Sequence, residues 1–88
     1  MISKTHENFW FCQHALPAAV QQLALGKFHL WQEEPFNPSL HFKELIRGVW
    51  SVRINQNYRA LGRLRGNLIV WFWIGTHAEY DQLLKRLK

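Results

Sequence analysis

A histidine and a tyrosine lie three residues apart near the C-terminus, and arginines precede them in the chain. They are His77 and Tyr80, with Arg53 and Arg59 upstream. Imidazole accepts or donates a proton near neutral pH, and guanidinium presents a fixed fork of donors that matches a phosphate. A tyrosine ring orients a base or stacks on a nucleobase. These residue types suit proton transfer beside a bound phosphate, so the candidate catalytic residues are His77, Arg59, Tyr80 and Arg53.

Further cations follow in the second half of the chain. From Lys43 onward there are nine Lys or Arg against three Asp or Glu, a net charge of +6, whereas the preceding residues carry −1. This asymmetry indicates a polyanion or an acidic protein as partner, with an ordinary solvated surface as the alternative. The residues expected to bind substrate are Lys43, Arg63, Arg65, Arg47 and His41.

Each candidate also has a purely structural interpretation. Arg59 would form an ion pair with Glu79 or Asp81, Tyr80 would fill the core, and His77 would only begin a helix. The convergence of several basic residues favours the functional interpretation. A metal site is not expected, because Cys12 and the nearby histidines lack the spacing of tetrahedral ligands, and no cofactor motif occurs.

Three strands are predicted to position these residues. Alternation with a period of two places them at Trp50–Asn55, Tyr58–Leu64 and Leu68–Ile74. Gly66-Asn67 is a two-residue hairpin signal between the last two. The third strand is apolar on both faces, which is typical of a central strand covered on both sides. We therefore expect its aromatic residues Trp71, Phe72 and Trp73 in the core, together with Trp50.

Helical periodicity predicts most of the remaining structure. A first helix ends near His14 with Ser3 or Thr5 as its cap, and a second covers Pro17–Glu33. A last helix begins at about His77, where Thr76 and Glu79 have the spacing of a capping box.

Two segments are less clearly patterned. Leu40–Leu45 alternates loosely and is expected to begin a short strand that Arg47-Gly48 breaks. Met1–Thr5 is either a loose segment or a frayed edge strand. With 88 residues the chain forms one domain, residues 1–88, of class α+β. In the expected fold, two N-terminal helices pack on a three- to four-stranded antiparallel sheet, followed by the C-terminal helix.

Three stretches of the chain resemble the RelE/ParE superfamily of bacterial toxins. They read LHFKEL at Leu40–Leu45, WSVRINQNYRAL at Trp50–Leu61 and IVWFWIGTHAEYDQLL at Ile69–Leu84. In order they match a basic strand, a Tyr-Arg strand and a final strand that runs into a histidine- and tyrosine-bearing helix. The resemblance implies the toxin of a type II toxin–antitoxin module, which a cognate and typically acidic antitoxin holds inactive.

The resemblance leaves a choice between two activities. RelE-like members are metal-independent endoribonucleases that cleave mRNA, commonly on the ribosome, and so inhibit translation. ParE-like members inhibit DNA gyrase by protein binding and need no catalytic residues. Cleavage by 2′-OH attack needs a base, an acid and cations for the phosphorane charge. His77 in Ile-Gly-Thr-His is similar to the ending of RelE-like ribonucleases and favours RNA cleavage. The alternatives are gyrase inhibition and an inactive nucleic-acid-binding relic.

The single cysteine and the absence of a long apolar run predict the compartment. Cys12 has no partner for an internal disulfide, which fits a reducing environment. The N-terminus lacks the apolar stretch of a signal peptide, and Leu68–Ile74 is too short to span a bilayer. We therefore expect a cytoplasmic protein without a membrane partner.

Overall fold

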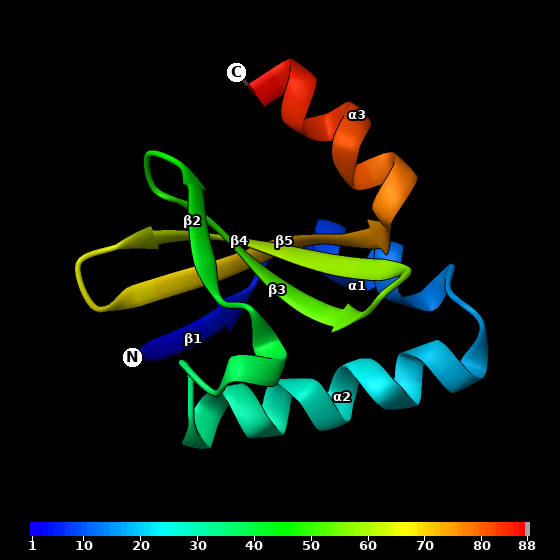
Figure 1. The fold of residues 1–88 in the computed structure, drawn as a ribbon, viewed down its shortest axis with the longest axis horizontal. Coiled ribbons are helices and arrows are strands. Elements are labelled where there is room, and N and C mark those ends of the chain that lie inside the picture. The colour runs from blue at the N-terminus through cyan, green and yellow to red at the C-terminus, as the bar shows by residue number, and fades with distance from the viewer. Residues whose placement is uncertain (88) are drawn as a thin grey trace.

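Two helices near the N-terminus and one at the C-terminus flank a run of strands (Figure 1). The computed structural model describes residues 1–87. Its elements are β1 (Ile2–Thr5), α1 (Glu7–His14), α2 (Ala18–Glu33), a 3₁₀ turn η1 (Pro38–Leu40), β2 (Lys43–Ile46), β3 (Val49–Asn55), β4 (Tyr58–Arg65), β5 (Leu68–Thr76) and α3 (His77–Leu87). The predicted helices and the three central strands are confirmed, with their ends displaced by at most two residues.

The strands form one mixed sheet rather than a purely antiparallel one. The order is β1-β5-β4-β3-β2, with β1 parallel to β5 and all other pairs antiparallel. The prediction of three or four strands was therefore short of the five observed, because Met1–Thr5 contains an edge strand. Backbone bonds hold that strand at both ends, from the Ile2 N–H to the Asn67 oxygen (2.7 Å) and from the His6 N–H to the Trp71 oxygen (2.8 Å). Four residues are too few to show a period in the sequence.

The cap of α1 also differs from the prediction. His6 occupies the N-cap position, where its Nδ1 accepts from the Asn8 N–H at 3.0 Å. The hydroxyls of Ser3 and Thr5 instead accept from the indole N–H groups of Trp71 and Trp10. Because β1 occupies the residues that were expected to begin the helix, neither hydroxyl is placed to cap it.

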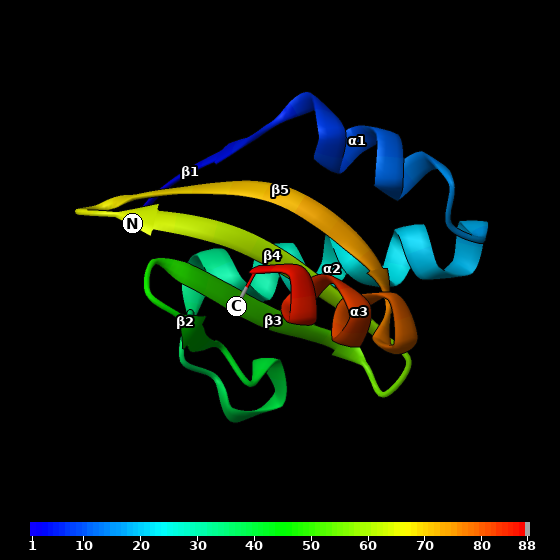
Figure 2. The ribbon, with the colours of Figure 1, turned by 90° about the horizontal axis from the view of Figure 1, so that it is seen from above.

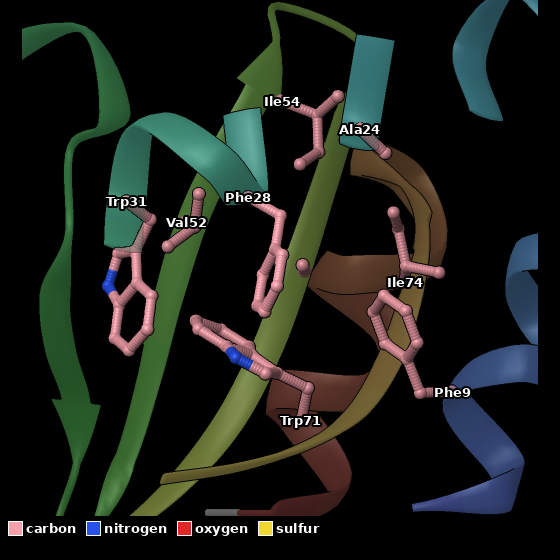
Figure 3. Close-up of a pocket in the computed structure, with 9 residues that line it drawn as sticks. Phe9, Ala24, Phe28, Trp31, Val52, Ile54, Trp71 and Ile74 are labelled. Atoms are coloured by element: carbon pink, nitrogen blue, oxygen red, sulfur yellow. The ribbon is translucent and has the colours of Figure 1, made fainter. Parts of the chain in front are cut away.

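The sheet has two faces, which we name after the helices that cover them. Figure 2 shows α2 and α3 on opposite sides of the sheet. The α2 face carries the larger core, in which Trp31 is 2% exposed and packs edge-on against Trp71 at 5.2 Å and Phe42 at 5.7 Å between ring centroids. A void of about 30 Å³ lies among these side chains (Figure 3) and is lined by apolar groups from α1, α2 and the sheet. It has room for about one water molecule and offers that water no polar partner, so it is part of the core and not a ligand site.

A bulge in β5 distributes its aromatic residues over both faces. Leu61 pairs with Trp73 while the next residue, Gly62, pairs with Trp71, so Phe72 is the extra residue. Trp71 therefore packs in the α2-face core, whereas Phe72 and Trp73 are partly buried on the α3 face. Of the three aromatic residues expected in the core, Trp71 is buried, whereas Phe72 and Trp73 are only partly buried against the smaller cluster. Gly62 permits this arrangement, because a Cβ there would lie 2.8 Å from atoms of Ile69 and Trp71.

A smaller cluster lies under α3. Val49, Leu61 and Tyr80 are its buried members, and partly buried leucines of α3 pack against them, namely Leu83, Leu84 and Leu87. Arg53, Arg59 and Arg63 alternate with buried residues on the same strands. The α3 face therefore presents both an apolar seat for the helix and the arginines predicted to bind substrate.

Candidate active site

The start of α3 fixes the position of His77. Thr76 and Glu79 form the predicted capping box: the Thr76 N–H donates to Glu79 Oε1 at 3.0 Å, and the Glu79 N–H donates to Thr76 Oγ1 at 3.2 Å. The His77 N–H donates to the Asn57 oxygen in the β3–β4 turn at 2.7 Å. The histidine backbone is thus tied both to its own helix and to the turn between the arginine-bearing strands.

Arg53 and Arg59 are directly opposite each other on β3 and β4. Cross-strand partners project on the same face of a sheet, so two like charges are neighbours here, which is unfavourable in the absence of an anion. Within residues 1–87, no carboxylate oxygen lies within 4.0 Å of a nitrogen of either arginine. A bound phosphate would supply the missing negative charge.

Backbone carbonyls hold the Arg59 guanidinium in place. Its Nη1 donates to the Tyr58 oxygen at 2.9 Å and also to the Asn55 oxygen. Both bonds use the same nitrogen, so in the described part of the chain the Nε and Nη2 donors are uncommitted. The guanidinium is therefore oriented by the protein while retaining donors for an anion.

The surroundings of Arg59 lower its pKa. Partial burial lowers this pKa first, and the charge of Arg53 lowers it further, while Tyr80 and Asp81 act in the opposite direction. Arginine stays protonated at physiological pH despite such a shift. Charges from β3 and from the first turns of α3 therefore both act on Arg59.

His77 has a carboxylate partner one turn along the helix. Its Nδ1 lies 3.1 Å from Asp81 Oδ2, and the two side chains are 47% and 55% exposed. The imidazole ring is 5.4 Å from the Tyr80 ring between centroids. An Nδ1 engaged with a carboxylate leaves Nε2 as the ring nitrogen available for proton transfer.

Tyr80 takes the structural role considered for it, and its role in the site stays a prediction. It is 8% exposed and belongs to the apolar cluster under α3, which confirms the core interpretation. The same side chain contacts His77 and lies close enough to Arg59 to affect its pKa. The Tyr80 ring therefore lies beside His77 and is packed in the cluster under α3.

The sequence analysis named Asp81 only as an ion-pair partner for Arg59. That pair is not formed, since Asp81 contacts His77, and Glu79 is engaged with Thr76. The His77–Asp81 contact has a signal in the sequence that was overlooked, because residues four apart on a helix are neighbours.

Lys43 lies on the same face as the arginine pair. It is paired with Ser51, which is two residues from Arg53 on β3. Diagonal neighbours of this kind are about 7–8 Å apart between Cα atoms, which a lysine side chain can bridge. Lys43 is exposed, and its place beside Arg53 and Arg59 as a substrate contact stays a prediction.

The other predicted binding residues lie elsewhere. Arg63 is about 13 Å from Arg59 along β4, at roughly 3.4 Å per residue. Together with Arg47 and Arg65 it lines a hollow of about 440 Å³ at the far end of the strand. His41 is in a left-handed turn (φ 45°) after η1, and no interaction within residues 1–87 joins it to His77. These residues stay predicted substrate contacts.

The described residues hold no other arrangement of this kind. No group of three His, Cys, Asp or Glu in residues 1–87 is placed to share a metal ion. In the same range, no helix has the length and hydropathy to cross a membrane.

Comparison with known proteins assigns the family. The model of the ParE-like toxin domain matches residues 18–82, nearly three quarters of the chain. The chain belongs to the ParE-like toxin family. The matched region begins with α2 and includes the arginine pair and His77. A search of curated protein sequences gave no significant match.

Solved toxins share the fold of this family member at low sequence identity. The YoeB/ParE toxin from Agrobacterium tumefaciens has a TM-score of 0.68 and 18% identity, over 88% of this chain and 99% of that one. The toxin–antitoxin complex RelBE2 from Mycobacterium tuberculosis has a TM-score of 0.69 and 22% identity, over 88% and 91%. The isolated RelE toxin of E. coli has a TM-score of 0.64 and 13% identity, over 99% and 98%. The fold is therefore the RelE-like α+β fold, and the chain is a toxin of a toxin–antitoxin module.

Proposed function

We propose that this toxin is a metal-independent endoribonuclease that cleaves mRNA and thereby inhibits translation. The observation that carries the proposal is the arginine pair Arg53–Arg59, which has no carboxylate partner in residues 1–87. The turn between their strands accepts the His77 N–H through the Asn57 oxygen. Cleavage needs a group that moves a proton, and His77 is half exposed with Nδ1 at Asp81, which leaves Nε2 without a bonded partner among residues 1–87.

The reaction follows from these groups. The ribose 2′-OH attacks the adjacent phosphorus, and the P–O5′ bond breaks to leave a cyclic phosphate and a 5′-hydroxyl. Arg59 and Arg53 stabilise the charge that develops on the phosphorane oxygens. His77 accepts the proton of the 2′-OH at Nε2, and the leaving 5′ oxygen takes a proton from water. Lys43 binds the phosphate from β2. Arg63, Arg65, Arg47 and His41 bind neighbouring nucleotides.

Gyrase inhibition is the second candidate, because the matching family model is that of ParE-like toxins. Expression of the toxin separates the two activities. Under our proposal, incorporation of labelled methionine falls first and incorporation of thymidine later. If thymidine incorporation falls first while protein synthesis continues, the gyrase alternative is correct and the ribonuclease proposal is wrong.

A purified system tests the chemistry directly. The toxin should cleave a single-stranded RNA in the presence of EDTA, with and without ribosomes. The same RNA carrying 2′-deoxy nucleotides should remain intact, because the nucleophile is then missing. Cleavage of the deoxy substrate would contradict the proposed mechanism even if the enzyme proved to be a nuclease.

The partner in the cell is a cognate antitoxin, and we expect it to be acidic. None of the Lys and Arg side chains in residues 1–87 forms an ion pair, although the chain from Lys43 onward carries +6. An acidic segment would gain from each of these unpaired charges. The RelBE2 toxin was solved as a complex with its antitoxin, which supports a partner of this kind here.

A further inference from the structure

A strip of the α3 face lies beside the active site and is not covered by α3. Arg63 pairs with Val49 on one side and with Val70 on the other, so Val70 points to the α3 face. Leu68 and Phe72 are two residues away in each direction and share that face. These three residues line a groove of about 310 Å³ together with His6, Arg63 and Arg65.

The groove is apolar at its floor and extends onto β1. Leu68 and Val70 are paired with Ile2 and Lys4, and Ile2 is 57% exposed. Neither Leu68 nor Val70 belongs to the described apolar cluster under α3. Figures 1 and 2 show the β4–β5 hairpin extending beyond the reach of that helix.

The rim of the groove is positively charged. Arg63 and Arg65 line the groove and also the adjoining hollow, which Arg47 shares. The Arg63 guanidinium lies 5.8 Å from the centre of the Phe72 ring. The one carboxylate that lines the hollow, Glu44, accepts from the Gly48 N–H at 3.0 Å. Within residues 1–87 these arginines have no acidic partner.

The side chains that line the groove favour one class of binding partner over the others. Leu68 and Val70 do not stack on nucleobases, and the one aromatic ring that lines the groove, Phe72, already has the Arg63 guanidinium over it, which argues against RNA as the occupant of the floor. A second copy of the chain would bring the same arginines toward one another, which costs energy without an intervening anion. An acidic protein segment with apolar anchors satisfies both the floor and the rim.

We propose that this groove binds the antitoxin through a segment that places apolar side chains on Leu68 and Val70 and carboxylates on Arg63 and Arg65. The proposal rests on the toxin–antitoxin function and deepens it. Because Arg63 and Arg65 are also the predicted contacts for RNA beyond the cleavage site, the bound segment would compete with RNA at these arginines. Inhibition would then require no contact with His77.

Charge reversal on the floor tests the proposal. The probe is the purified antitoxin encoded next to the toxin gene, and its Kd is measured by calorimetry or fluorescence anisotropy. Leu68→Glu should weaken binding by 30-fold or more, because a carboxylate would replace the apolar contact and repel an acidic segment. The matched control is Leu25→Glu on α2, where the leucine is 40% exposed, and it should change the Kd by less than threefold. Thermal unfolding should show that both variants are folded.

Parallel measurements keep this proposal separate from the proposed ribonuclease activity. At saturating RNA, free Leu68→Glu toxin should cleave at the wild-type rate, because Leu68 is outside the candidate site around His77. Its affinity for RNA should fall, because the new carboxylate lies opposite Arg65. The groove proposal would be overturned if Leu68→Glu bound the antitoxin within threefold of the wild-type Kd. It would also be overturned if the wild-type toxin proved to be a dimer and Leu68→Glu a monomer. Loss of oligonucleotide binding by Leu68→Glu with intact antitoxin binding would assign the groove to RNA instead. If wild-type toxin cleaves no RNA but Leu68→Glu still loses the antitoxin, the ribonuclease proposal fails and the groove proposal stands.

Discussion

The two faces of the sheet differ in what they bury. On the α2 face, Trp31 and Trp71 are 2% and 3% exposed and meet edge to face. On the α3 face, the helix seats its leucines on a small cluster, while His77 and Asp81 remain about half exposed. Stability is thus concentrated on the α2 face, and the residues proposed for chemistry lie on the α3 face. This division permits unpaired cations on the α3 face, because the core that holds the sheet together does not depend on them.

Removing the central aromatic of the α2 face should have the largest effect. Trp31→Ala deletes a ring that contacts Phe28, Phe42 and Trp71 and should lower the free energy of unfolding by about 3–5 kcal/mol. A domain of this size has little more than that in total, so the variant should be largely unfolded at 37 °C. Chemical denaturation followed by circular dichroism measures the change.

The matched control is an exposed aromatic on α1. Phe11 is 78% exposed, and Phe11→Ala should change the free energy of unfolding by less than about 0.5 kcal/mol. If Trp31→Ala were as stable as Phe11→Ala, the α2 face would not be the main source of stability, and the contrast between the two faces would fail.

The corresponding change on the α3 face should affect rate and leave stability intact. His77→Ala should slow RNA cleavage by about 10²–10⁴-fold, or roughly 3–5 kcal/mol of barrier. The fold should survive because the side chain is half exposed and contributes little to the core. Single-turnover cleavage by purified, folded protein measures the effect, and full activity would remove His77 from the chemistry.

Arg59→Ala should fail in a different way. Loss of the guanidinium should reduce cleavage and also weaken RNA binding, with the slope of log K against log salt falling by about 0.7 for a single-stranded substrate. His77→Ala should leave that slope nearly unchanged if the imidazole is neutral at the working pH. Binding titrations at several salt concentrations distinguish the two, and equal slopes in both variants would contradict separate roles for binding and proton transfer.

Much of this contrast was accessible from the sequence. Alternation of apolar residues predicted the three central strands, and the spacing of Thr76 and Glu79 predicted the cap of α3. The bulge at Phe72 was not predictable, because a single extra residue in β5 leaves no break in its apolar run. The sequence left Met1–Thr5 open between a loose segment and an edge strand, since the partner of β1 lies more than sixty residues away and only the folded sheet brings the two together.

The candidate site was predicted in part. The face shared by Arg53 and Arg59 follows from alternation within each strand, but their direct opposition depends on the register of β3 with β4. The sequence grouped Arg63 and Arg65 with them, whereas the structure places these two in a separate groove near the hairpin. Spacing along a strand tells which residues share a face, but it does not tell whether they belong to the same site.

Asp81 should matter far less to the reaction than His77. The pair is solvent-exposed and spaced at i,i+4, an arrangement that contributes about 0.3–0.5 kcal/mol. Asp81→Asn should therefore reduce the cleavage rate by only about twofold, because the amide can still accept from Nδ1. A loss approaching that of His77→Ala would mean that the pair becomes buried when RNA binds, and that orientation of the imidazole depends on it.

The smallest expected effect concerns the cap that positions His77. The N–H and hydroxyl of Thr76 donate to Glu79 and lower the pKa of this carboxyl below its ordinary value of 4.5. A carboxyl with a lowered folded-state pKa stabilises the protein above the unfolded-state pKa, and that contribution is lost as the pH falls through the folded-state pKa.

Glu79→Gln keeps a hydrogen-bond acceptor and removes only the charge. It should cost a few tenths of a kcal/mol near pH 7, since the group is exposed and solvent screens it. Denaturation of both proteins between about pH 7 and pH 3 should show the difference closing below about pH 4.5. A difference that stayed constant over this range would mean that the cap acts through its geometry, and that the charge at the start of α3 contributes nothing to holding His77 in place.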